Sequence, residues 1–204
     1  MTATPIPRTL SITYHGDMDL SIIDELPKSR VPVVTKVIEP DRLPKVYNFI
    51  KSEINLGRQC MIIYPLVEES EKSDLAAAES AYLELSNTVF SEFNIGLLHG
   101  QMKKDEKENV MKEFSQNNIN IIVATTVIEV GIDIPNANTL IVNNAQSFGL
   151  SQLHQLRGRI GRSDKKAYAY LVTPKNNVLS EISQKRLKAL QDYAEIGSGF
   201  SIAN

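Results

Sequence analysis

Apolar positions follow two alternating patterns along the chain from about residue 33 onward. Short runs of consecutive apolar residues, rich in valine and isoleucine, predict buried strands, whereas apolar residues at every third or fourth position predict amphipathic helices. Strands are expected within residues 31–38, 59–67, 95–100, 119–126, 137–145 and 167–174. Helices are expected within residues 41–57, 75–93 (with Asp74 as the N-cap), 103–116, 153–162 and 178–197.

The alternation of strands and helices predicts an α/β fold. Strands that are apolar on both faces are typical of a mainly parallel sheet covered by helices on both sides, which makes a three-layer domain. The first 30 residues carry three prolines and no complete strand–helix unit. We therefore divide the chain into residues 1–32, the tail of a preceding domain with a linker, and residues 33–204, the α/β domain.

The composition of the chain limits which classes of function are possible. The chain has 204 residues, 42% of them hydrophobic, and a formal net charge of −2, so any contact with nucleic acid has to come from a local basic patch. The single cysteine, Cys60, lies in an apolar run and is interpreted as a core residue. No apolar stretch is long enough to span a bilayer and no secretory signal is present, so we expect a cytoplasmic protein without membrane contact.

Three arginines fall within six residues of LSQLHQLRGRIGRSDKK, residues 150–166. On a helix, Gln155, Arg159 and Arg162 are spaced i, i+4, i+7 and form one polar stripe. A second stripe, turned away from the first, is apolar and would anchor the helix to the sheet. Two glycines in four residues suggest that a ligand or a partner backbone approaches closely. Two interpretations remain open here: a solvated basic surface, or cations that grip phosphate oxygens.

Polar residues also follow the predicted strands. Thr125 ends an apolar run, and Gly131 and Asp133 follow it in VATTVIEVGIDIPNA. In a parallel sheet, ligands bind at the carboxyl ends of the strands, so this loop is a candidate site for a phosphate or a sugar hydroxyl. His99 follows another strand. Two interpretations stay open for it: its side chain contacts a phosphate, or it only forms a hydrogen bond within the turn. His154 lies off the polar stripe and is interpreted as structural.

Four segments in order resemble motifs III to VI of the superfamily-two helicases. They are TATPIPRT, LLHGQM, VATTVIEVGIDIP and QLHQLRGRIGR. Within that superfamily, YPLVEESEKSDLAAAE and IDELPKSRVPV are similar to the RecG family of bacterial DNA translocases, and the Mfd family is a close alternative. The resemblance covers the whole chain and implies a RecA-like domain.

The resemblance also assigns expected roles to individual residues. In motif VI, it implies that Gln155, Arg159 and Arg162 line the ATP cleft, with the arginines as fingers on the γ-phosphate. In motif V, Gly131 and Asp133 would lie near the ribose and the finger. It places Thr125, His99 and Gly100 on the DNA track, and Thr2 and Thr4 in motif III, which couples nucleotide state to DNA grip.

Two parts of a complete motor are missing from the sequence. No two glycines are five positions apart, so the chain has no G-x-x-x-x-G-K-[ST] phosphate loop, and it has no D-E-x-H box for magnesium. We therefore expect the second RecA-like domain of a longer helicase, with ATP and Mg²⁺ held mainly by a first domain. Alone, the chain is expected to be inactive as an ATPase.

The expected partners of the whole protein are that first domain and branched DNA. By resemblance, the protein would remodel stalled replication forks and Holliday junctions in DNA repair and recombination. Two alternatives stay open: a transcription-repair coupling translocase of the Mfd type, and a RecA-like module that binds protein without catalysis. Residues 1–30 are expected to pack on this domain or on a neighbouring chain, as in a crystal contact or a domain swap.

Overall fold

The computed structural model describes residues 31–65, 71–125, 134, 136–174 and 179–192. Within these ranges, strands and helices alternate as the apolar pattern predicts. The strands are β1 (Val34–Ile38), β2 (Gln59–Ile63), β3 (Ile95–Leu98), β4 (Ile121–Ala124), β5 (Ala137–Val142) and β6 (Tyr168–Val172). The α-helices are α2 (Leu43–Asn55), α3 (Glu71–Glu84), α4 (Lys104–Ser115), α5 (Leu150–Arg157) and α6 (Glu181–Asp192). Shorter helical turns are η1 (Pro40–Arg42), η2 (Leu85–Val89) and η3 (Ala145–Ser147).

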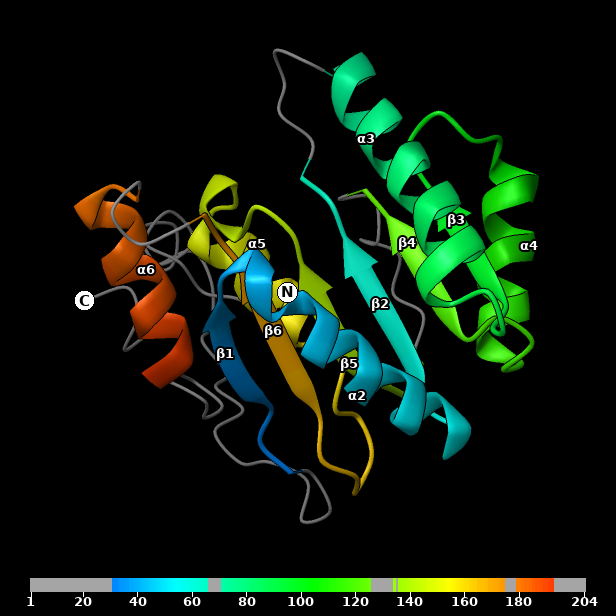
Figure 1. Cartoon of the computed structure of the whole chain (residues 1–204), viewed down its shortest axis with the longest axis horizontal. Helices are drawn as coiled ribbons and strands as arrows, with labels where there is room; N and C mark the ends of the chain where they lie inside the picture. The colour runs from blue at the N-terminus through cyan, green and yellow to red at the C-terminus, as the bar shows by residue number, and fades with distance from the viewer. Residues whose placement is uncertain (1–30, 66–70, 126–133, 135, 175–178, 193–204) are drawn as a thin grey trace, which may run out of the picture.

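The six strands form one sheet in the order β1-β6-β5-β2-β4-β3, and every neighbouring pair is parallel. The expected parallel α/β architecture is therefore confirmed. Because all strands run the same way, their amino ends lie along one side of the sheet and their carboxyl ends along the opposite side, as the arrows in Figure 1 show. We call these two sides the amino edge, where the strands begin, and the carboxyl edge, where they end.

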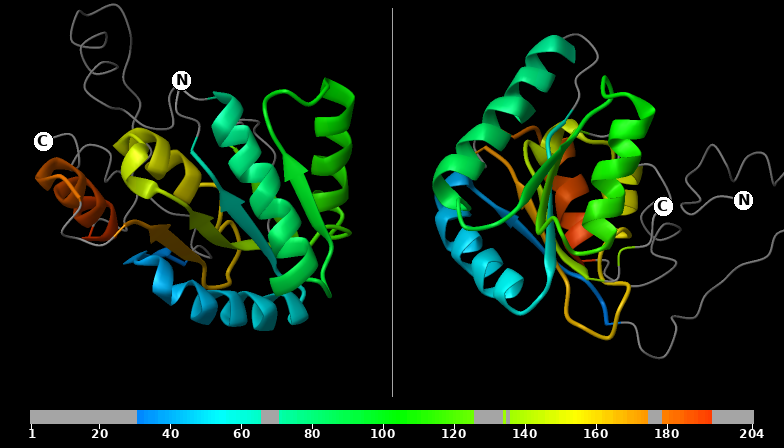
Figure 2. Two further views of the ribbon diagram at one scale, coloured as in Figure 1. Left: turned by 45° about the horizontal axis from the view of Figure 1, so that its top comes forward. Right: turned by 90° about the vertical axis from the view of Figure 1, so that its right-hand side faces the viewer.

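Helices cover both faces of the sheet, as the right-hand view of Figure 2 shows. Helix α2 and the segment α3–η2 pack on one face, and α4, α5 and α6 pack on the other. Side chains of β2 alternate between the two cores, since Ile62 belongs to the α2 side and Ile63 to the α4–α5–α6 side, and both are fully buried. The buried apolar runs of the sequence thus become strands covered on both sides.

Several expected boundaries differ from the observed ones. Helix α3 begins at Glu71, so Asp74 lies within its first turn and is not its N-cap. The same helix was expected to run to residue 93, but regular α-helix ends at Glu84 and a π-helical turn, η2, follows. Gly57 follows the end of α2 and has a positive φ of +80°, which favours glycine.

Candidate functional site

The arginine stretch forms a short helix followed by a tight turn. Helix α5 begins after Gly149, whose N–H donates a 2.9 Å hydrogen bond to Oε1 of Gln152. It ends at Arg157, and Gly158 caps it. Gly161 then adopts a positive φ of +69°, which turns the chain out of the helical path. We call residues 158–166, which run from this cap to two residues before β6, the arginine segment.

The expected polar stripe is therefore wrong beyond Arg157. Gln155 is exposed on α5, but Arg159 and Arg162 lie past the helix end, and the left-handed turn at Gly161 separates them. Arg159 is half-buried and Arg162 is exposed, with its Nε donating to the carbonyl oxygen of Gly158 at 3.3 Å. The apolar stripe does anchor the segment, because Leu153, Leu156 and Ile160 are all buried.

The third arginine, Arg157, has a structural position. Its side chain is buried, and Nη1 donates a 2.9 Å hydrogen bond to the main-chain oxygen of Leu190. This contact joins the end of α5 to α6. Neighbouring arginines in one motif thus take different roles, and only Arg159 and Arg162 remain candidates for a ligand.

Gly161 is needed for packing inside the domain. A Cβ atom added there would lie 2.9 Å from Cγ2 of Val33 and 3.0 Å from Cβ of Ala167. Gly158 has an ordinary helical φ of −67°. The expectation that these glycines mark the close approach of a ligand or a partner backbone is thus corrected for Gly161, because its close neighbours are the side chains of Val33 and Ala167, next to β1 and β6.

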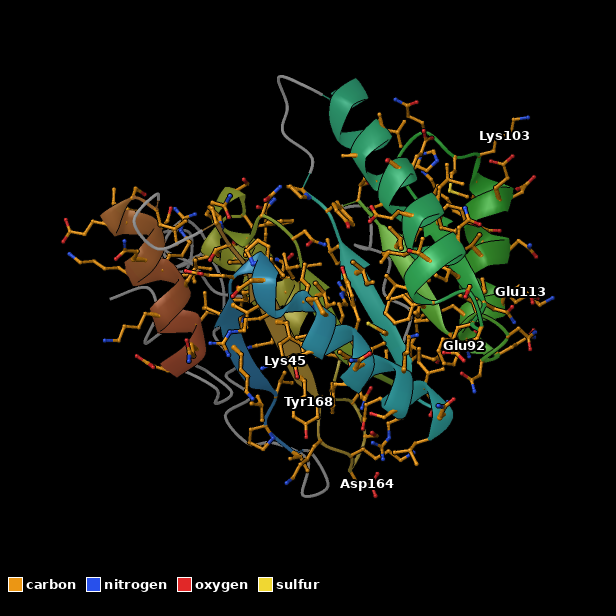
Figure 3. The ribbon with its side chains drawn as sticks, in the orientation of Figure 1. Lys45, Glu92, Lys103, Glu113, Asp164 and Tyr168 are labelled. Atoms are coloured by element: carbon orange, nitrogen blue, oxygen red, sulfur yellow. The ribbon has the colours of Figure 1, made fainter. Side chains whose placement is uncertain are left out.

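Contacts of the arginine segment place it at the amino edge. The N–H of Gly161 donates to the oxygen of Ala137, the first residue of β5, at 3.4 Å. Asp164, two residues after Arg162, lies near the start of β6 at Tyr168, whereas Lys103 lies at the opposite end of the molecule (Figure 3). The candidate phosphate ligands are therefore not at the carboxyl edge, where parallel sheets usually bind ligands.

Thr125, His99 and Gly100 lie at the carboxyl edge, where β3 and β4 end side by side. The N–H of Thr125 donates to the oxygen of Leu98 at 3.1 Å. The Thr125 hydroxyl and Nδ1 of His99 are both buried, and neither has a hydrogen-bond partner among the described residues. The oxygen of Gly100 accepts from Nζ of Lys107 at 2.6 Å. The fold thus brings these three predicted residues together.

Four predicted site residues lie outside the described part of the chain. They are Thr2 and Thr4 near the N-terminus, and Gly131 and Asp133 in the loop after β4. The described neighbours of that loop, Thr125 and Asn136, lie at opposite edges of the sheet, since Asn136 directly precedes β5 and accepts from the N–H of Gln59. Their roles stay predictions.

A polar cluster at the amino edge was not predicted from the sequence. Glu53, in the last turn of α2, accepts hydrogen bonds at Oε2 from Nη1 of Arg58 (2.7 Å) and from Nδ2 of Asn138. Glu53 and Asn138 are buried. A signal was available, because Glu53 interrupts an apolar helix stripe and Asn138 lies in an apolar strand.

Other candidate groups have structural surroundings. Burial raises the pKa of the Cys60 thiol well above its usual range, which supports its interpretation as a core residue. Burial, and then the positive charge of Arg157, lower the pKa of His154, which lies on α5. Across the described ranges, the helices are all too short or too polar to cross a bilayer.

Comparison with known proteins identifies the family of this domain. Residues 41–164 match the family described as the helicase conserved C-terminal domain. The ATP-dependent DNA helicase RecG of Synechocystis sp. is 49% identical over 203 residues, which cover 100% of this chain and 24% of that protein. RecG of Thermotoga maritima is 43% identical, again over 100% of this chain and 25% of the relative. The chain thus spans about a quarter of the curated relatives that it matches.

Solved structures agree with this assignment. A structure of RecG bound to a three-way DNA junction is 41% identical over 98% of this chain and 25% of that chain, with a TM-score of 0.78. The second domain of the DEAD-box helicase Mss116p, bound to an RNA duplex, shares the fold at 18% identity, with a TM-score of 0.60 over 80% of this chain and 61% of that one. The chain therefore belongs to the helicase conserved C-terminal domain family.

Proposed function

We propose that this chain is the second motor domain of a RecG-type, ATP-dependent DNA translocase of the bacterial cytoplasm. Identity to RecG along the whole chain and the likeness to a junction-bound RecG support this proposal. The whole protein would remodel branched DNA such as stalled forks and Holliday junctions. One observation carries the proposal: the two sets of candidate residues lie at opposite edges of a single sheet.

At the amino edge, Arg159 and Arg162 would face the γ-phosphate of ATP. Guanidinium groups suit this position because they donate to phosphate oxygens and keep their charge. Arg162 is exposed, and the Arg159 guanidinium has no acceptor among the described side chains and carbonyls, so both are compatible with an incoming phosphate. Gln155, exposed on α5, would line the same cleft, with Gly131 and Asp133 near the ribose.

The chain would supply only half of the ATP site. In the described ranges, no three His, Cys, Asp or Glu side chains are grouped so that they could hold a metal ion. Because the sequence has neither a G-x-x-x-x-G-K-[ST] phosphate loop nor a D-E-x-H box, we assign the phosphate loop and the magnesium ligands to a first RecA-like domain. When both domains close, the arginines would stabilise the charge of phosphoryl transfer, an effect worth about 10³–10⁵ in rate.

At the carboxyl edge, Thr125, His99 and Gly100 would contact the DNA backbone. The unpartnered Thr125 hydroxyl and His99 Nδ1 offer hydrogen-bonding capacity where β3 and β4 end. Contacts to phosphate and sugar carry no base information, so we expect little sequence preference. Because the chain carries a net charge of −2, this binding has to be local.

The parallel sheet joins the two sites mechanically. ATP-dependent closure would pull on the amino edge, and a sheet packed on both faces would transmit the displacement to the carboxyl edge as a rigid body. Alternate gripping of DNA by the two domains would then produce directional steps. Thr2 and Thr4, in motif III, would link this movement to the preceding domain.

Single substitutions in the full-length protein test the arginine assignment. Arg159→Ala and Arg162→Ala should each lower the DNA-stimulated kcat for ATP by at least about 10²-fold, as expected for transition-state charge stabilisation. Arg42→Ala, which removes an exposed arginine of η1, is the matched control and should keep wild-type turnover. Wild-type turnover in both finger variants would refute the assignment and favour a domain that binds protein without catalysis.

A second experiment tests the division of labour between domains. The purified 204-residue chain should show no magnesium-dependent ATP hydrolysis, because it lacks a phosphate loop. A colorimetric phosphate assay with and without DNA measures this directly. Turnover that disappears in Arg162→Ala would show that the chain holds a complete site and would overturn the two-domain proposal.

A further inference from the structure

We infer that Glu53 and Asn138 are positioning residues that hold the arginine segment at the amino edge in its working geometry. The inference rests on the proposed function of Arg159 and Arg162. Neither residue is part of the four helicase-like motifs, and the two are 85 positions apart in the chain. Their contacts and the attachment points of the arginine segment carry the inference.

Every polar group of the Asn138 side chain is in use. Nδ2 donates to Oε2 of Glu53 and, at 3.5 Å, to the main-chain oxygen of Lys166, while Oδ1 accepts from the Thr139 hydroxyl at 3.1 Å. An amide has two N–H donors, so it can serve both acceptors at once. Asn138 therefore links the end of α2 to the last residue of the arginine segment.

The Glu53 carboxylate makes this link strong. Its Oε2 accepts both Nη1 of Arg58, at 2.7 Å, and Nδ2 of Asn138. A hydrogen bond to an ionised acceptor is about twice as strong as a neutral one, and burial increases the difference. The carboxylate thereby fixes the Asn138 amide, and the amide presents its second N–H to Lys166.

The arginine segment has attachments on both sides of Arg162. Before it, Ile160 is fully buried and the N–H of Gly161 donates to Ala137, the residue next to Asn138 in β5. After it, the oxygen of Lys166 accepts from Asn138. Arg162 itself is exposed and its Nε donates to the oxygen of Gly158 within the same segment, so the position of the main chain that carries it depends on these flanking anchors. If the Lys166 anchor is lost, the chain after Arg162 is held only from Ala167 onward, which is buried and accepts from the N–H of Val34 at 2.9 Å, so the turn that carries the guanidinium is less tightly fixed.

A displaced guanidinium affects the transition state more than ground-state binding. Errors of about 1 Å in a catalytic group can cost roughly 10²-fold in rate. Here only one of several anchors is lost, so we expect a smaller effect on kcat and almost none on the affinity for ATP. That pattern separates positioning from general damage to the domain.

The test uses Asn138→Ala in the full-length protein, with ATPase kinetics at saturating DNA. The kcat should fall about 10-fold while the KM for ATP stays within about twofold, because the lost contact acts only through the arginines. Affinity for ADP with aluminium fluoride, which mimics the transferring phosphoryl group, should weaken about 10-fold. Affinity for ADP alone should not change.

Asn118→Ala is the matched control. Asn118 also donates from Nδ2 to a glutamate, Oε2 of Glu113 at 3.0 Å, but this pair is on the surface at the end of α4, away from Asp164 (Figure 3). Its kinetics should match the wild type. Glu53→Gln keeps the shape and an acceptor oxygen but removes the charge, so its loss in kcat should be smaller than that of Asn138→Ala.

Three outcomes would overturn the inference. The first is a wild-type kcat in Asn138→Ala alongside large losses in the arginine variants, which would leave the proposed function intact. The second is an equal weakening of ADP and of ADP with aluminium fluoride, which indicates general damage. If Asn138→Ala does not fold, Glu53→Gln becomes the test of the inference. A wild-type kcat in Glu53→Gln would be the third outcome that overturns it. Normal turnover in the arginine variants would instead refute the proposed function.

Discussion

The Nη1 atom of Arg157 lies 2.9 Å from the main-chain oxygen of Leu190 and donates a buried hydrogen bond to it. This bond joins two helices that are neighbours on the same face of the sheet, α5 and α6. Arg157 belongs by sequence to a cationic cluster, yet its side chain is buried and satisfies a helix carbonyl. Adjacent arginines of one motif therefore differ in what their loss should do.

Arg157→Ala should lower the free energy of unfolding of the chain. Removal of the guanidinium leaves the Leu190 oxygen buried without this donor, which costs about 1–3 kcal/mol. Urea denaturation followed by circular dichroism measures the change. Arg42→Ala, at an exposed position, should stay within about 0.5 kcal/mol of the wild type. An equally small change for Arg157→Ala would show that its bond to α6 contributes no net stability.

Two glycines with positive φ offer a paired stability experiment. At Gly57, φ is +80° and an added Cβ would meet nothing within 4 Å, so Gly57→Ala should cost only the backbone strain of about 1–2 kcal/mol. At Gly161, an added Cβ would also meet Val33 and Ala167 at about 3 Å. Overpacking adds about 1–3 kcal/mol there. Thermal and urea unfolding of both variants should therefore rank Gly161→Ala as the more damaging, and the reverse order would contradict this packing.

His154 should make stability depend on pH. Burial and the charge of Arg157 lower its pKa in the folded chain below the ordinary value of 6.5. The unfolded chain then binds more protons between the two pKa values, so stability is complete above about pH 6.5 and decreases as the pH falls below it. Urea titrations between pH 7.5 and 5.5 should show a steeper loss for the wild type than for His154→Gln. Parallel curves would mean that His154 contributes nothing to the pH dependence.

Much of the fold could be predicted from the order of residues. Runs such as QCMII are apolar at nearly every position, and β2 is indeed buried along its whole length. The amphipathic pattern of residues 103–116 places Met111 and Phe114 in the core, with Val110 packed against it. These predictions succeed because strand and helix periods depend on local geometry, and burial of one face follows from them.

Local pattern could not give the end of α5 or the position of its arginines. A continuous helix predicts Arg159 and Arg162 on one stripe, but Gly161 takes a left-handed turn, and a Cβ atom there would meet Val33 at 2.9 Å and Ala167 at 3.0 Å. Those neighbours are distant in the chain or follow the turn. The stripe was therefore wrong because Gly158 caps α5 and Gly161 turns the chain, although the apolar repeat still continued through Ile160.

The sequence by itself determined which segments become strands and helices, which of their apolar faces are buried, and which motifs can supply chemistry. Only the tertiary structure decided that the sheet order is β1-β6-β5-β2-β4-β3 and that the arginine segment and Thr125 lie at opposite edges. It also brought Glu53 to Asn138, a pair that no local pattern relates. The physical reason is that strand order and such long-range contacts depend on how the helices pack across the whole sheet. The apolar periodicity of a segment indicates only which of its own faces is buried.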